Sequence, residues 1–344
     1  MHVPDGFIDA PTSAVTGVVA AGALAVSLRG ARRELGEERA APLAGLVAAF
    51  IFAVQMLNFP VAAGTSGHLL GGALAAILVG PCTAVLCVSV VLLMQGVLFA
   101  DGGLTALGVN ITDMAITTTV VAYAVFRGLL ALLPRTRRSV TGASFVAALV
   151  SVPAAAVVFT LIYAIGGTTD VSLGKVATAM IGVHVLIGIG EAVITALTVG
   201  AVVAVRPDLV YGARGLRRRL RLQVNGELVD APSATPAPVA ARTSRRTLWI
   251  TGLVTSLVLA GFVSFYASAN PDGLEKVAHD QGIDRKSERH ASADSPLADY
   301  GVKDVSDARL SGGLAGVIGV GVTVVAGSAV FWAVRRRRSV PAEV

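Results

Sequence analysis

The sequence predicts an all-α fold, a polytopic membrane helix bundle. Hydrophobic residues make up 54% of the 344 residues and charged residues only 15%, whereas soluble domains carry about 25% charged residues. Apolar runs of roughly 20 residues recur along the chain, and a helix needs about that length to cross a bilayer. Alternating polar and apolar segments of about ten residues, typical of membrane β-barrels, are absent from the sequence. Membrane lipid is therefore the expected surrounding of most of the chain.

The predicted spans form two groups, about seven in the first part of the chain and a two-span hairpin near its end. They fall at residues 13–28, 43–59, 68–81, 83–100, 108–133, 141–166, 175–205, 247–267 and 312–334. The third span, "HLLGGALAAILVGP", is short and interrupted by glycine. Such elements are tolerated at membrane depth only when they are buried in protein or line a cavity. In transporters they indicate substrate sites.

The distribution of basic residues predicts the orientation in the membrane. Segments that carry arginine alternate with loops that carry neither lysine nor arginine. The arginine-bearing segments are 29–39, 127–138, 206–246 and 335–338, and the loops are 60–67, 101–107 and 167–174. Because basic loops stay in the cytoplasm, we expect an outside N-terminus and a cytoplasmic C-terminus in the plasma membrane of a prokaryote. The chain start lacks the basic and apolar regions of a signal peptide, so we expect Met1 to carry a free α-amine.

Composition divides the chain into four parts. Residues 1–206 form the first membrane module, 207–246 a basic and Ala/Pro-rich cytoplasmic linker, 247–334 the hairpin and 335–344 a basic cytoplasmic tail. The hairpin encloses an outside loop, 268–311, which carries nine Asp or Glu against six Lys or Arg. This loop is mildly acidic on the face where a cation would arrive, although an ordinary solvated loop has a similar composition.

Several function classes are disfavoured by the sequence. The net charge of +6 is spread over short segments between spans, which indicates topology and no nucleic-acid partner. Cys82 and Cys87 lie in an apolar stretch without a CxxC pattern, so we interpret them as core residues. No Walker A motif occurs. The chain is therefore not expected to be an enzyme, and any ATP hydrolysis would belong to another subunit.

The first residues, "MHVPDGF", have the pattern of a terminal metal chelate. The Met1 α-amine, the deprotonated His2 amide nitrogen and the His2 imidazole Nδ1 would close a five-membered and a six-membered ring around one ion. A fourth nitrogen would complete the planar set that Ni(II) and Cu(II) favour and that Co(II) can adopt. The alternative is that His2 is an ordinary frayed terminal residue.

His68 is the candidate for the fourth nitrogen. It follows Ser66 in "GTSGHLLGG", where an outside loop enters the interrupted third span. Ionisable residues at membrane depth are costly and usually face a functional interior. Asn110 ends another Gly-rich outside loop, "DGGLTALGVN", which we interpret as a lid or as support for the site, although a plain helix connection has the same features.

His184 and Glu191 are two further ionisable residues inside a predicted span. They stand seven residues apart in "HVLIGIGE" and therefore share one helix face. Groups of this kind point at partners within the bundle. They are either metal ligands or charged residues that join helices, and the pattern favours the second role.

Four motifs together resemble the CbiM/NikM family, the substrate-binding (S) components of energy-coupling-factor importers for cobalt and nickel. They are "MHVPDGF", "GTSGHLLGG" with "AILVGP", "LFADGGLTALGVN" and "HVLIGIGEAVIT", in family order over residues 1–206. Residues 247–334, with "PDGLEKVA" and "SPLADYGV", look like the PDGLE-type accessory domain that is often fused to these components.

The resemblance implies a bundle whose N-terminal segment plugs the outer half and builds the metal site. By matching position, it implies four nitrogen ligands from the Met1 amine, the His2 amide, the His2 imidazole and the His68 imidazole. It implies Co2+ or Ni2+ as the transported substrate, no permanently bound cofactor, and as partners a transmembrane coupling (T) component with two ABC ATPase subunits. Asp101 departs from the family, which commonly has histidine before the GGLT loop. The sequence does not separate cobalt from nickel.

Two alternatives belong to other function classes. "GTSG" at residues 64–67 matches the GxSG motif of rhomboid-type intramembrane serine proteases, with Ser66 as the nucleophile and His184 as its base. An ion-coupled secondary transporter would fit the predicted helices but needs no chelate at the N-terminus.

Overall fold

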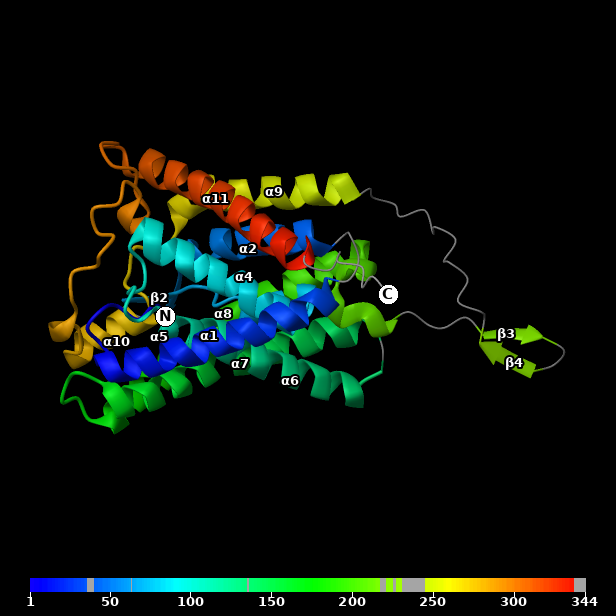
Figure 1. Cartoon of the computed structure of the whole chain (residues 1–344), viewed down its shortest axis with the longest axis horizontal. Helices are drawn as coiled ribbons and strands as arrows, with labels where there is room; N and C mark the ends of the chain where they lie inside the picture. The colour runs from blue at the N-terminus through cyan, green and yellow to red at the C-terminus, as the bar shows by residue number, and fades with distance from the viewer. Residues whose placement is uncertain are drawn as a thin grey trace, which may run out of the picture.

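A computed structural model describes residues 1–35, 40–62, 64–134, 136–216, 221–224, 227–230 and 245–336. Figure 1 shows a bundle of long helices that run along one axis. The described residues also form two antiparallel strand pairs. In chain order the elements are α1 Ala10–Glu34, α2 Ala40–Gln55, β1 Phe59–Ala62, β2 Thr65–Gly67, α3 Gly72–Val79, α4 Pro81–Met94, α5 Leu107–Asn110, α6 Thr118–Leu132, α7 Arg137–Gly166, α8 Leu173–Val205, β3 Arg221–Val224, β4 Glu227–Asp230, α9 Arg245–Gly261, α10 Gly273–Gln281 and α11 Ala308–Arg336. One π-helical turn, Gln95–Phe99, extends α4, and another, Ile111–Thr117, joins α5 to α6.

Seven helical stretches within the described residues are long and apolar enough to cross a membrane. They are Ala10–Glu34, Pro81–Phe99, Leu107–Leu132, Arg137–Gly166, Leu173–Val205, Arg246–Tyr266 and Ala308–Val334, and Pro42–Gln55 is a shorter apolar helix. The all-α polytopic bundle predicted from the sequence is thereby confirmed. The predicted linker and tail lie partly outside the described residues, including the Ala/Pro-rich segment 231–244 and residues 337–344.

The predicted third span, 68–81, has only eight helical residues. Helix α3 is therefore about 12 Å long, too short to cross a bilayer by itself. The backbone stops it at both ends, because Gly71 and Gly80 have φ angles of 92° and 102°, a region that favours glycine. Ahead of α3, the antiparallel hairpin β1–β2 and an extended segment lead the chain inward. The part of this segment between β2 and α3 is thus not helical, and all of α3 is buried.

Two buried glutamates accept hydrogen bonds from free backbone amides, one at the start of α3 and one at the start of α4. Glu191 of α8 accepts hydrogen bonds from the Leu70 and Gly71 amides at 2.6 and 3.1 Å, at the start of α3. Glu34 of α1 accepts from the Cys82 and Thr83 amides at 3.0 and 2.7 Å, at the start of α4. Carboxylates suit these positions because the first amides of a helix lack intrahelical acceptors and carry partial positive charge. The interrupted helix is therefore held by charges on neighbouring spans.

The accessory hairpin packs directly on the first module. Helix α11 lies along α2, and α9 contacts both of them. Small residues permit this approach, since a Cβ atom added at Gly45 of α2 would meet Ser328 of α11 and one added at Gly319 would meet Phe52. Helix α10 and the rest of the loop between α9 and α11 cover the end of the bundle where the N-terminus lies (Figure 1). The two modules therefore share one end of the molecule.

Candidate metal centre

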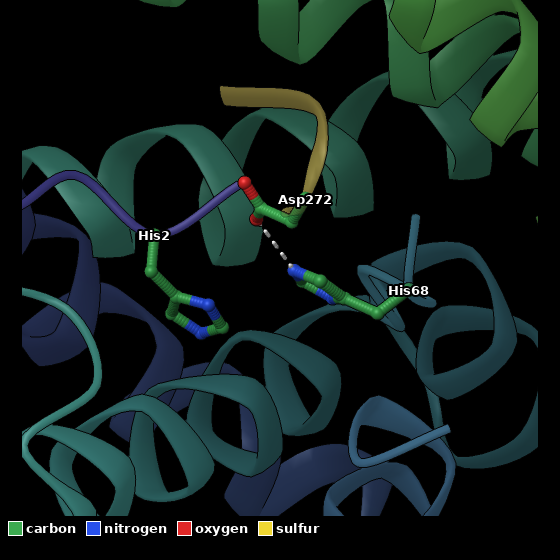
Figure 2. A group of neighbouring side chains, drawn as sticks. All are labelled: His2, His68 and Asp272. Atoms are coloured by element: carbon green, nitrogen blue, oxygen red, sulfur yellow. Dashed lines mark ion pairs between the residues drawn. The ribbon is translucent and has the colours of Figure 1, made fainter. Parts of the chain in front are cut away.

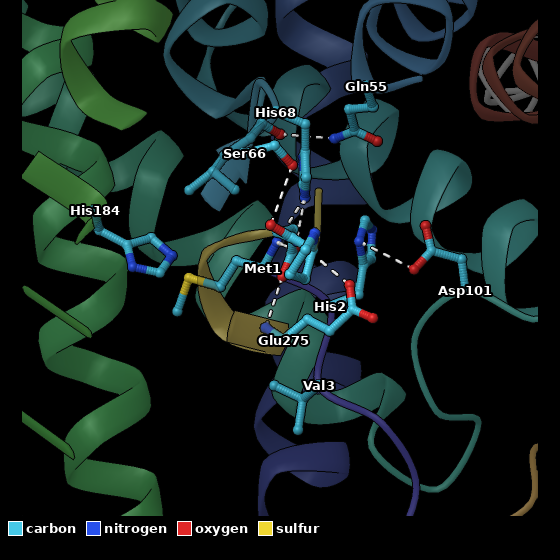
Figure 3. Close-up of polar contacts among 12 residues, drawn as sticks. Met1, His2, Val3, Gln55, Ser66, His68, Asp101, His184 and Glu275 are labelled. Atoms are coloured by element: carbon cyan, nitrogen blue, oxygen red, sulfur yellow. Dashed lines mark hydrogen bonds and ion pairs between the residues drawn. The ribbon is translucent and has the colours of Figure 1, made fainter. Parts of the chain in front are cut away.

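The N-terminal residues and His68 meet inside the bundle, although 67 positions separate Met1 from His68. The Met1 amine lies 2.6 Å from His68 Nε2, and the His2 and His68 rings stack with centroids 5.0 Å apart. Met1 is 2% exposed and His68 5%. Figure 3 shows Met1 and His2 lying beside the His68 ring. The structure thus places Met1, His2 and His68 together in a largely buried position.

Hydrogen bonds to the Gly-rich loop, residues 101–110, hold the N-terminal segment in place. Asn110 accepts a hydrogen bond from the Val3 amide at 2.7 Å and donates one to the Val3 carbonyl at 3.1 Å. The Gly103 amide also donates to the Val3 carbonyl, and the Thr105 amide donates to Asp5 Oδ1, both at 2.8 Å. Asn110 is buried and holds the backbone that follows the first two residues, an arrangement that favours the supporting role over the lid.

His68 presents the nitrogen with the free lone pair to the amine. Its Nδ1 lies 3.0 Å from the Leu69 carbonyl oxygen. Since a carbonyl only accepts hydrogen bonds, Nδ1 carries the proton and the lone pair of Nε2 is left available to a donor or a metal ion. The hydrogen bond to its neighbour thus selects the tautomer that a metal ligand needs.

The His2 ring has other partners in this arrangement. Nδ1 lies 3.3 Å from Asp101 Oδ1, and Nε2 lies 3.2 Å from Gln95 Oε1. Burial lowers the pKa of the His2 imidazole to about 4, and the nearby Asp101 carboxylate opposes this only in part. The ring is therefore neutral at physiological pH and keeps a lone pair. Closing the terminal chelate requires Nδ1 to exchange Asp101 for the metal.

A carboxylate from the accessory domain, which the sequence analysis did not assign to the site, completes the cluster. Asp272 Oδ2 lies 2.6 Å from the Met1 amine and 3.4 Å from His68 Nε2 (Figure 2). One ring nitrogen each of His2 and His68 and one Asp272 oxygen lie within 4.8 Å of one another. Burial by itself raises the pKa of Asp272, but the N-terminal ammonium outweighs it and holds this pKa well below its usual range.

Ser66 tethers the accessory loop to the first module. Its hydroxyl donates to the Asn270 carbonyl at 2.7 Å and lies 3.2 Å from the Pro271 carbonyl. Its backbone amide also donates to the Pro271 carbonyl, at 2.9 Å. This contact joins positions some 200 residues apart, so it leaves no local pattern in the sequence.

His184 and Glu191 do not join the three-residue cluster and do not bond to each other. Glu191 links α8 to α3, which agrees with the predicted role in joining helices. His184 Nδ1 instead bonds to the Met180 carbonyl of its own helix at 2.8 Å, and Nε2 has no hydrogen-bond partner among the described residues. The His184 ring lies near the start of α10, where a Cβ atom added at Gly273 would come within 3.4 Å of its Cε1.

Ser66 and His184, the catalytic pair of the protease alternative, are not hydrogen-bonded to each other. In the described part of the chain, the Ser66 hydroxyl bonds to backbone carbonyls of the accessory loop and not to His184. An activated serine needs a base within hydrogen-bond reach. The geometry therefore gives Ser66 a structural role.

A polar cavity of about 900 Å³ opens beside the cluster and is lined by both modules. His2, His68 and Asp101 contribute from the first module, and Asp272, Glu275 and Tyr300 from the accessory domain. The Tyr300 hydroxyl donates to Asp101 Oδ2 at 2.6 Å. Acidic groups from both modules thus surround the approach to the imidazoles.

The fold and this cluster define an integral membrane protein of the metal-transport class. Residues 2–209 match the model of the cobalt uptake substrate-specific transmembrane region, CbiM, and residues 246–336 match the PDGLE domain. The chain belongs to the CbiM family and carries a fused PDGLE domain, as its motifs predicted.

Similar proteins are named for cobalt, nickel or transition-metal transport. The cobalt transport protein CbiM of Sorangium cellulosum is 32% identical over 216 residues, 61% of this chain and 94% of that protein. The fused nickel transport protein NikMN of Rhodobacter capsulatus is 44% identical over 126 residues, 37% of this chain and 36% of that protein. The crystal structure of a truncated transition metal transporter matches with a TM-score of 0.52 and 30% identity, over 59% of this chain and 99% of that one.

Proposed function

We propose that this chain is the substrate-binding component of an ATP-driven energy-coupling-factor importer and captures Co2+ or Ni2+ at the outside face of the plasma membrane. The observation that carries the proposal is the convergence of the Met1 amine, His2 and His68 in a largely buried position beside a polar cavity. Relatives named as cobalt and nickel transport proteins support the same substrates.

The proposed ligands are four nitrogens: the Met1 amine, the His2 amide, His2 Nδ1 and His68 Nε2. The first three belong to one terminal chelate, and His68 Nε2 already lies 2.6 Å from the amine. Nitrogen-rich planar sets suit both Ni(II) and Co(II). Binding displaces protons from the amine and the amide, so metal affinity is expected to fall as the pH falls.

The proposed energy supply lies outside this chain, in a T component and two ABC ATPases. Purified chain in liposomes is therefore expected to bind Co2+ or Ni2+ without accumulating it. Uptake against a gradient should appear when the T component and both ATPases are incorporated with ATP, and the control is an ATPase variant that cannot hydrolyse ATP. Sustained accumulation by the chain alone, driven by a proton or sodium gradient, would favour the secondary transporter.

The proposed orientation puts the metal cluster outside and the basic segments inside. The cluster and α10 share one end of the bundle, whereas α1 ends at the other with Arg32 and Arg33 in its last turn (Figure 1). In a background with both native cysteines replaced, Ser287→Cys in the exposed part of the accessory loop should react with a membrane-impermeant thiol reagent in intact cells. Ser233→Cys in the linker should react only after the membrane is opened. The reverse labelling pattern would contradict this topology.

A further inference from the structure

The accessory domain places a carboxylate oxygen at ligand spacing from two proposed metal ligands. Asp272 Oδ2 lies 2.6 Å from the Met1 amine and 3.4 Å from His68 Nε2, and these two nitrogens are 2.6 Å apart. Neighbouring ligands that bind one ion at about 2.0–2.2 Å lie about 2.8–3.6 Å from each other for right-angled to tetrahedral geometry. The three atoms therefore have nearly the spacing of one face of a coordination shell before any ion is bound.

Local structure holds this oxygen in place. Asp272 is the N-cap of α10, where its Oδ1 accepts from the Glu275 amide at 2.8 Å and leaves Oδ2 to face the cluster. Ser66 fixes the residue before it through two contacts to the Pro271 carbonyl. A Cβ atom added at Gly273 would lie 2.8 Å from Ile187 of α8, so the glycine lets the start of α10 approach the bundle. Asp272 is thus positioned by its own helix and by the first module.

We propose that Asp272 Oδ2 is a fifth ligand of the transported ion, supplied by the PDGLE domain to the nitrogen set of the first module. This inference rests on the proposed function. The oxygen approaches both the amine and His68, so it lies beside two members of the proposed nitrogen set. The accessory domain then contributes directly to metal capture.

Charge favours the same assignment. A divalent ion bound to a deprotonated His2 amide and three neutral nitrogens carries a net charge of +1. One carboxylate makes the complex neutral, and burying an uncompensated charge is costly. Asp272 is the carboxylate that contacts both the Met1 amine and His68, whereas Asp101 contacts His2. The neutral five-ligand complex is the one suited to a site this buried.

The test compares Asp272→Asn with Asp280→Asn in the full chain. Asparagine caps helices as well as aspartate does, so α10 keeps its N-cap while the anionic oxygen is lost. Asp280 lies on the same helix, is exposed and pairs with Lys276, which makes it a matched change of charge. Calorimetry with Ni2+ and with Co2+ should show at least about a tenfold loss of affinity for Asp272→Asn and little change for Asp280→Asn.

A spectroscopic measurement separates a ligand from a nearby charge. X-ray absorption of bound Ni2+ should show five nitrogen or oxygen ligands in the wild type, and a planar four-coordinate ion in Asp272→Asn. Asp272→Ser, which also keeps a capping side chain, should give the same four-coordinate spectrum. An unchanged coordination number in both variants would overturn the inference, whatever their affinities, and would leave Asp272 as a partner of the free amine. If the wild-type chain itself binds neither metal, the proposed function fails and this inference fails with it.

Discussion

Blocking the Met1 α-amine is expected to abolish high-affinity Co2+ and Ni2+ binding while the fold is retained. A short tag fused ahead of Met1 turns the amine into an amide nitrogen, which breaks the terminal chelate but keeps both histidines. The amine is also enclosed, since Met1 is 2% exposed and contacts His68 and Asp272. Calorimetry on tagged and untagged chain measures the effect, and thermal unfolding of the metal-free proteins checks the fold.

A removable tag supplies the control for this experiment. A protease that cuts immediately before Met1 should restore binding to the same preparation, and intact-mass measurement verifies that Met1 is then the first residue. Retention of Met1 is expected because methionine removal requires a small second residue and His2 is bulky. If the tagged chain binds either metal as tightly as the cleaved chain, the terminal chelate is wrong.

Replacing His68 is the second change with a large expected effect. His68→Ala removes the nitrogen that lies 2.6 Å from the amine and leaves three nitrogens in the terminal chelate. Removal of groups that only support metal ligands costs about 10–100-fold in affinity, so loss of a ligand should cost at least about 100-fold. Metal-dependent growth or radioactive cobalt uptake in cells that express the whole importer should fall to background.

Ser66→Ala is the matched control two residues away. It removes the hydroxyl contacts to the accessory loop but keeps the backbone bond from the Ser66 amide to the Pro271 carbonyl. Loss of a hydrogen bond of this kind costs about 0.5–1.5 kcal/mol, which corresponds to a loss of metal affinity of about tenfold or less. Most uptake should therefore remain. Labelling of Ser66 by a fluorophosphonate probe, lost in His184→Ala, would instead support a serine protease.

Predictions from the sequence succeeded where the cause is local. The length of an apolar run reports directly whether a helix can cross hydrocarbon, which is why the long spans from α4 to α8 follow the predicted segments. The chelate pattern of Met1 and His2 is also local, because its atoms are joined by one peptide unit, but metal binding by it stays a prediction. For α3 the sequence indicated an interrupted element, and Gly71 and Gly80 supply the break.

Apart from the pairing of His68 with the N-terminus, contacts between distant segments were not predicted from the sequence. Glu191 was recognised as a buried ionisable residue, but its partner is the start of a helix about 120 positions away. The sequence identified the "PDGLE" motif without relating it to the metal site, since nothing in that segment specifies a contact with an amine 271 residues earlier. The same holds for the hydrogen bond from the Tyr300 hydroxyl to Asp101. Asp101 is the position at which the resemblance led us to expect histidine.

The sequence by itself determined a multi-pass helical membrane protein with a metal-chelating pattern at its N-terminus, because hydropathy and chelate rings depend on neighbours along the chain. Only the tertiary structure decided which groups face that pattern: His68 with its Nε2 toward the amine, Asn110 on the Val3 backbone, and Asp272 from the accessory domain. The physical reason is that ligand geometry is fixed by the packing of helices whose contacts cross hundreds of residues. Such packing depends on how the surfaces of distant segments fit together, which no local pattern of residues encodes.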